Sequence, residues 1–104
     1  MKQIVEYLLS KKRSGIKSDL EDYCAVIAYN QYYELLSEEW KDALIRGKNS
    51  PNAFIMKRKD AKQYAKLEFV EIYAIPDEYM CIDDFCEAYE TGEISNDELD
   101  MIEL

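Results

Sequence analysis

Apolar residues recur every three or four positions along most of this chain, the spacing that places them on one face of a helix. The first such stripe predicts a helix within residues 4–13. Ser18 and Glu21 are spaced like the two members of a capping box and predict the start of a long helix over 18–35. Apolar and aromatic residues lie on nearly every side of that helix, which predicts a central helix packed by several neighbours.

The middle of the chain gives weaker patterns. A short helix is predicted over 38–46, and the loop-forming residues of 48–53 follow it. Residues 54–56 are typical of a short strand, whereas Asp60 is predicted to open another helix. Residues 67–75 are rich in Phe, Val, Ile and Tyr, but their apolar positions do not alternate, so a helix is favoured over a strand.

The last third of the chain has the clearest pattern. Gly92 is placed to end a helix, and Ser95 and Glu98 form another capping-box pair that predicts a short terminal helix. Before Gly92, four apolar residues are spaced as one helix face: Ile82, Phe85, Cys86 and Tyr89.

These elements predict the fold class. At 104 residues the chain has the length of one domain. We predict a mainly α fold, a single compact helical domain over residues 1–104 with about five or six helices. A small β-hairpin within residues 53–75 is compatible with this pattern, and an α+β fold is the alternative.

Charge is distributed unevenly along the chain. Residues 1–66 hold all 13 Lys and Arg with nine Asp and Glu, a net charge of +4. Residues 67–104 hold thirteen Asp and Glu and no Lys or Arg, a net charge of −13, so the whole chain carries −9. Surfaces normally mix the two signs to limit self-repulsion. This segregation therefore indicates either a solubilising surface or a face for a basic partner.

Residue types that carry catalysis or bind cofactors are scarce. The chain has no His, and its three Gly are isolated, which excludes a His general base and a phosphate-binding glycine loop. Cys24, Cys81 and Cys86 form no Cys-x-x-Cys pair, and this odd number of cysteines is typical of a reducing compartment. No apolar run reaches the ~18–20 residues that span a bilayer. We therefore predict a cytoplasmic protein that is not an enzyme, uses no cofactor or metal, and does not bind membranes.

The acidic segment supplies the candidate binding site. On the predicted helix, Asp83, Glu87 and Glu90 lie at i, i+4 and i+7, so their carboxylates share one face. Duplex DNA carries one negative charge per ~1.7 Å of axis, and a row of carboxylates can imitate phosphates for a protein that binds nucleic acid with Arg and Lys. Tyr79 is predicted to be exposed and to face the partner, because Tyr is enriched at protein interfaces. The predicted partner-binding residues are Asp77, Glu78, Tyr79, Asp83, Asp84, Glu87, Glu90 and Glu93.

Two basic clusters support an alternative function. They lie within residues 11–17 and 57–66, and they would contact phosphates together if the fold brought them side by side. The net negative charge of the chain opposes the approach of DNA or RNA, so direct nucleic-acid binding ranks second. Its candidate residues are Lys11, Lys12, Arg13, Lys57, Arg58 and Lys59.

In composition, the chain resembles the small acidic inhibitors of phages and mobile elements that mimic nucleic acid, including anti-restriction and anti-CRISPR proteins. The resemblance rests on size, acidity and the absence of His, and it transfers no residue roles. The sequence therefore predicts a non-enzymatic protein that binds and inhibits a basic, nucleic-acid-binding partner. A small nucleic-acid-binding or regulatory accessory protein is the alternative, and a structural subunit ranks third.

Overall fold

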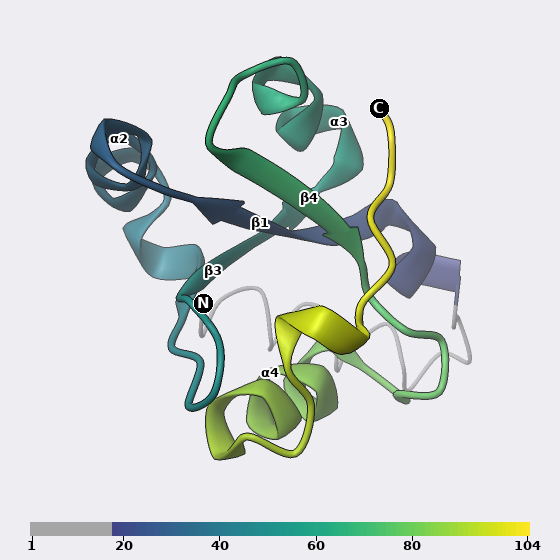
Figure 1. Cartoon of the computed structure of the whole chain (residues 1–104). Helices are drawn as coiled ribbons and strands as arrows, with labels where there is room; N and C mark the ends of the chain where they lie inside the picture. Colours follow the sequence, from purple (N-terminus) through teal and green to yellow (C-terminus); the bar gives the residue numbers. More distant parts are fainter. Residues whose placement is uncertain (1–17) are drawn as a thin grey trace.

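A computed structural model of the chain describes residues 18–104, which form one antiparallel sheet with helices on both of its faces (Figure 1). The strands are β1 (Tyr23–Ala28), β2 (Leu44–Ile45), β3 (Ala53–Lys57) and β4 (Val70–Ala74). The α-helices are α2 (Gln31–Glu39), α3 (Arg58–Ala61) and α4 (Ile82–Thr91). Short 3₁₀ helices are η1 (Ser18–Asp22), η2 (Lys41–Ala43), η3 (Lys62–Tyr64) and η4 (Asn96–Glu98).

The predicted mainly α fold is wrong. Residues 18–104 contain three α-helices and a four-stranded sheet, so the fold is α+β. The strand order is β2-β3-β1-β4, with β1 between β3 and β4. The small β-hairpin suggested within 53–75 is also wrong. The two strands in this range, β3 and β4, do not pair with each other, because each pairs with β1. The helix predicted within residues 4–13 lies outside the described residues.

The largest local error is the long helix predicted over 18–35. Residues 18–22 form η1, β1 follows directly, and helical structure resumes only at Gln31. All six residues of β1 are buried. A strand covered on both faces has no polar face, and its continuous apolar run resembles that of a buried helix. Asn30, with a φ of 58°, turns the chain from the strand into α2.

Two other segments also differ from the prediction. Over 38–46, α2 ends at Glu39 and the chain continues through η2 into β2, so the predicted helix is replaced by a turn and an edge strand. Over 67–75, the chain forms β4, whose backbone from Val70 to Ala74 pairs antiparallel with β1. Long-range pairing with β1 decides this conformation, and the segment's own spacing does not reveal it.

The two faces of the sheet separate two apolar clusters. Alternation along β1 sends Ala25 and Ile27 toward α4, and Cys24 and Val26 toward α2 and α3. The α4 face continues into the C-terminal region, where Ile94 and Leu99 join the same cluster; the other face is closed by Leu36, Ala61 and Tyr64. Figure 1 shows α4 on one side of the sheet and α3 on the other.

Three predicted elements are confirmed. Residues 54–56 lie in β3, and α4 covers Ile82–Thr91 and ends at Gly92. Ser95 and Glu98 form the predicted capping box, although the helix that it starts is the single turn η4. Among residues 18–104, no helix is long and apolar enough to cross a membrane.

Candidate functional site

The helix α4 is fixed to the sheet by a continuous apolar face. Its buried residues are Ile82, Phe85, Cys86, Ala88 and Tyr89. The Phe85 ring lies 5.8 Å from the Tyr89 ring, centroid to centroid. Tyr89 also donates a hydrogen bond of 2.6 Å from its hydroxyl to the carbonyl oxygen of Pro51, which ties the helix to the loop before β3. The orientation of α4, and so of its polar face, is therefore determined by the core.

Gly92 ends α4 in a conformation that only glycine adopts easily. Its φ is 82°, and its N–H bonds to the carbonyls of Ala88 and Tyr89, as in a helix that closes with a left-handed residue. A Cβ at this position would lie 2.5 Å from the Asn49 side-chain nitrogen. The chain therefore turns sharply here, and the Glu93 N–H bonds to the carbonyl of Ala88.

The polar face of α4 carries the predicted acids. Asp83, Glu87 and Glu90 are exposed, and Asp84 is half-buried. At 1.5 Å per residue, Asp83 and Glu90 are separated by ~10 Å along the helix axis. A duplex of that length carries ~6 charges, so the helix alone is a sparse imitation of a phosphate track. Flanking loops must supply further negative charge if a protein that binds nucleic acid is to recognise these carboxylates in place of phosphates.

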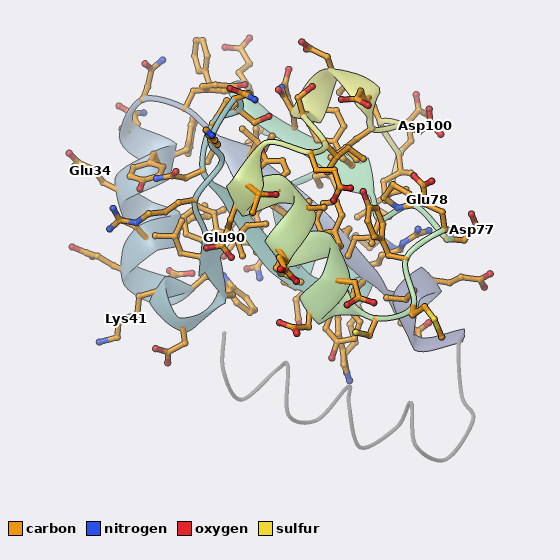
Figure 2. The ribbon with its side chains drawn as sticks, turned by 90° about the horizontal axis from the view of Figure 1, so that it is seen from below. Glu34, Lys41, Asp77, Glu78, Glu90 and Asp100 are labelled. Carbon is orange, nitrogen blue, oxygen red and sulfur yellow. The ribbon has the colours of Figure 1, made fainter. Side chains whose placement is uncertain are left out.

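The loops that flank α4 carry further carboxylates. Asp77, Glu78 and Glu93 are exposed, as predicted. In Figure 2, Glu90 lies on α4 while Asp77, Glu78 and Asp100 follow one margin of the same view. We use the name α4 acidic surface for Asp77, Glu78, Asp83, Asp84, Glu87, Glu90 and Glu93.

A groove adjoins the α4 acidic surface and contains acids that the prediction did not include. It has a volume of about 480 Å³, with Ile75 and Pro76 among its lining residues. Glu21, from η1, reaches it from a distant part of the sequence, so no local pattern could have identified this residue. The acids lining the groove are Glu21, Asp77, Glu78, Glu98 and Asp100.

Tyr79 is less exposed than predicted. Its side chain is half-buried and packs edge-on against Phe85, with ring centroids 5.7 Å apart. Burial raises the pKa of the Tyr79 hydroxyl, and the charges of Glu78, Glu93 and Glu98 raise it further. Tyr79 therefore serves as part of the support beneath these acids, and its hydroxyl lies in a region of negative potential.

The cysteines are poorly placed for nucleophilic chemistry. Cys24, Cys81 and Cys86 are all buried. Burial raises the pKa of the Cys24 thiol to about 12, and burial followed by the charges of Glu90 and Asp83 raises that of Cys86 to about 12. Thiolate is the reactive form, so these two thiols are inert at neutral pH. No group of three Cys, Asp or Glu within residues 18–104 is arranged to hold a metal ion.

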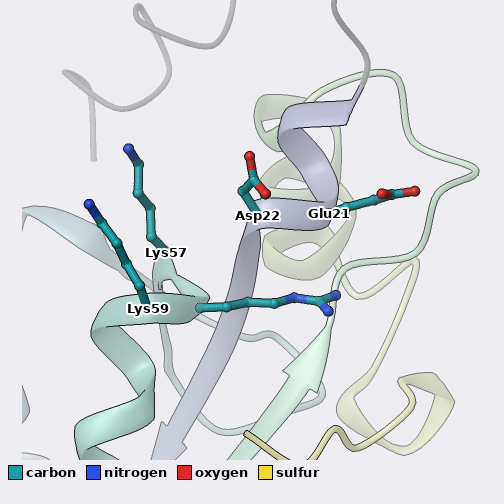
Figure 3. Close-up of a pocket in the computed structure, with 5 residues that line it drawn as sticks. Glu21, Asp22, Lys57 and Lys59 are labelled. Carbon is teal, nitrogen blue, oxygen red and sulfur yellow. The ribbon is translucent and has the colours of Figure 1, made fainter.

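The described part of the alternative basic site is mixed in charge. Lys57, Arg58 and Lys59 line a cavity of about 250 Å³, but Glu21 and Asp22 line it too. Figure 3 shows Lys57 and Lys59 extending beside Asp22. Carboxylates in the same cavity oppose phosphate binding there. Lys11, Lys12 and Arg13 lie outside the described residues.

Comparisons with protein-family models, curated proteins and solved structures gave no match.

Proposed function

We propose that this chain is a non-enzymatic cytoplasmic protein that binds a basic, nucleic-acid-handling protein through the α4 acidic surface and inhibits it. The observation that carries the proposal is that α4 and its flanking loops carry seven acids, six of them exposed, and that a buried apolar face fixes the helix. A partner that recognises phosphates with Arg and Lys would meet a surface that is negatively charged, as phosphates are.

Energetics support a binding role for these acids. Neighbouring like charges on a helix cost ~0.2–0.5 kcal/mol per pair. Burying a side chain such as Phe85 contributes ~1.5–3 kcal/mol, so the apolar face of α4 more than offsets the repulsion on its polar face. Asp83 and Asp84 lie in the first turn of α4, where negative charge favours the helix. Glu87 and Glu90 have no such role in folding, and they are free to contact a basic partner.

The charge pattern also favours fast association. A surface with one sign of charge steers an oppositely charged partner, and salt screens that attraction. We expect the association rate with the partner to fall steeply as ionic strength rises, in a stopped-flow or surface-based kinetic measurement. A rate that does not change between low and high salt would exclude electrostatic steering.

The identity of the partner class is tested by affinity capture followed by competition. The chain is immobilised, basic proteins are captured from a cell lysate, and duplex DNA or RNA is added to the washed matrix. If this chain occupies the nucleic-acid site of its partner, added nucleic acid should release the captured protein from the matrix. Retention of the captured protein at saturating nucleic acid would contradict the proposed mechanism of inhibition.

An electrophoretic shift assay separates this proposal from direct nucleic-acid binding. The purified chain should not shift DNA or RNA at physiological salt, because its net charge is −9. Micromolar binding that disappears when Lys57, Arg58 and Lys59 are changed to Ala would instead support the alternative function.

A further inference from the structure

The exposed residues of α4 form a row of acids. Within residues 83–90 every exposed position is an acid, namely Asp83, Glu87 and Glu90. The other residues of this span are buried, except for Asp84, which is half-buried. Intervals of four and three residues place the three acids on one side of the helix, over a length of ~10 Å. We call these three residues the acid row.

A helical segment elsewhere in the molecule carries a matching row of lysines. The elements α3 and η3 form one helical run over 58–64, whose Ala61 and Tyr64 are buried in the cluster on that face of the sheet. Within residues 59–66 no acid is exposed, and Asp60 is half-buried. The exposed positions are Gln63 and three lysines, which we call the lysine row: Lys59, Lys62 and Lys66.

The two rows match in spacing when their helices run antiparallel. The lysine row has intervals of three and then four residues, and the acid row has the same intervals when it is read from its C-terminal end. A residue of η3 rises ~2.0 Å and a residue of an α-helix ~1.5 Å, so the lysine row is slightly longer, at ~12 Å. The long, flexible side chains of lysine can take up this difference. The facing pairs are then Lys59 with Glu90, Lys62 with Glu87, and Lys66 with Asp83.

The sheet separates the two rows within one molecule. Tyr64 packs in the cluster on one face of the sheet, whereas Phe85 and Tyr89 pack in the cluster on the other face. Figure 1 shows α3 and α4 on opposite sides of the sheet. The lysine row can therefore face this acid row only when the two rows belong to different copies of the chain.

We propose that the chain associates with itself head to tail, with the lysine row of one copy against the acid row of the next. Each copy has one row of each kind, so the contact is heterologous and adds copies in an open chain. Exposed ion pairs each contribute little, so we expect a weak contact with a dissociation constant on the order of 1 mM.

Self-association of this kind would regulate access to the α4 acidic surface. The contact covers the whole acid row, so a copy in the chain must release its neighbour before a basic partner can bind there. The inference does not rest on the proposed function, because it is tested with the purified chain and without any partner. Failure to find a basic partner and failure to find self-association are therefore separate outcomes.

Salt provides the first test, by sedimentation equilibrium of the purified full chain at up to ~1 mM. The net charge of −9 opposes contact between copies, but at ~0.15 M salt the screening length is ~8 Å, so facing charges interact while distant ones are screened. At ~1 M salt that length is ~3 Å, and the facing rows are screened too. We expect an average mass above that of the monomer at the lower salt and the monomer mass at the higher salt. A monomer at both would overturn the proposal.

Two variants test whether the rows meet each other. One removes the lysine row (Lys59→Gln, Lys62→Gln and Lys66→Gln), and the other removes the acid row (Asp83→Asn, Glu87→Gln and Glu90→Gln). Each variant alone should associate about tenfold more weakly than the unmodified chain. An equimolar mixture should regain the association but stop at a dimer, because each variant retains one row. Undiminished association of either variant alone, or a mixture that does not dimerise, would overturn the proposal.

A third variant separates pairing of the rows from the effect of overall charge. It removes three exposed acids at and after α2: Glu34→Gln, Glu38→Gln and Asp42→Asn. This variant and the acid-row variant lose the same number of negative charges, which by itself reduces repulsion between copies. The α2 variant should therefore associate at least as strongly as the unmodified chain, while the acid-row variant associates more weakly. Equal behaviour of the two variants, with circular dichroism showing both folded, would refute the pairing.

Discussion

The helices α4 and α2 both carry acids on their surfaces, but the acids have different roles. Five residues of α4 are buried, and its acids point away from them. In α2 only Leu36 is buried, and a carboxylate takes part in holding this face of the molecule together. Trp40 donates from its indole nitrogen to the Tyr64 hydroxyl at 2.8 Å, and that hydroxyl donates to Glu39 at 2.9 Å.

Acidity alone therefore does not identify a binding surface. An acid that accepts a hydrogen bond from the core side, as Glu39 does, has a structural role. An acid on a helix that the core already fixes, as Glu87 is, can change without loss of stability and is available for binding.

The largest effect is expected from the apolar face of α4. Phe85→Ala should cost ~3–5 kcal/mol, because Phe85 is fully buried between Tyr79 and Tyr89 and its removal leaves a cavity. Urea denaturation measures this loss. Leu35→Ala on α2 is the control, since Leu35 is 43% exposed and should change stability little. Similar losses for the two variants would mean that α4 is not fixed in the way described.

A smaller effect is expected from the hydrogen-bonded chain beside α2. Tyr64→Phe should cost ~1–3 kcal/mol, because it leaves the Trp40 indole N–H without its acceptor. Glu38→Ala, a change at an exposed neighbour of Glu39, should stay within ~0.5 kcal/mol. The same urea experiment applies, and an unchanged stability of Tyr64→Phe would remove the structural role assigned to this chain of bonds.

Alkaline pH probes the α4 side of the sheet. Burial, together with the hydrogen bond to Glu71, raises the pKa of Tyr29 and of Tyr73 to about 12. In the unfolded chain both titrate at ~10, so the folded state holds its protons longer and this contribution to stability is complete below pH ~10. It is lost as pH rises toward 12. Tyrosine absorbance of the folded chain should show that Tyr29 and Tyr73 lose their protons at higher pH than free tyrosine. Glu71→Gln should shift this ionisation to lower pH. Ionisation of both tyrosines at the ordinary pH in the folded state would contradict the prediction.

The comparison also explains which parts of the fold were predictable. The helix α4 can be predicted from its own residues, because one face is apolar, the other is acidic, and Gly92 ends it. The strand β1 cannot be predicted in this way, because all six of its residues are buried. A buried strand lacks the alternation of apolar and polar residues that identifies a half-exposed strand. β4 depends likewise on pairing with β1, so its conformation is decided by residues more than forty positions away.

Only part of the candidate site could be predicted from the sequence. The exposure of Asp83, Glu87 and Glu90 follows from their place opposite the apolar face. That Glu21 joins Glu98 and Asp100 at one groove depends on how η1 and the C-terminal region meet, which no local pattern contains. Tyr79 was misjudged because a tyrosine before an acidic helix can lie over a core ring as readily as in solvent.

We infer that the acids of α4 act in binding and not in folding. It is tested most directly by changing Asp83, Glu87 and Glu90 together to Lys and measuring both unfolding and affinity for the captured partner. The matched control changes Glu34, Glu38 and Asp42, three exposed acids at and after α2, to Lys. We expect both variants to keep their stability within ~1 kcal/mol. Like charges set opposite each other in an interface cost several kcal/mol, so the α4 variant should lose its partner while the control keeps it. Normal binding by the α4 variant, or equal loss in the control, would contradict the claim.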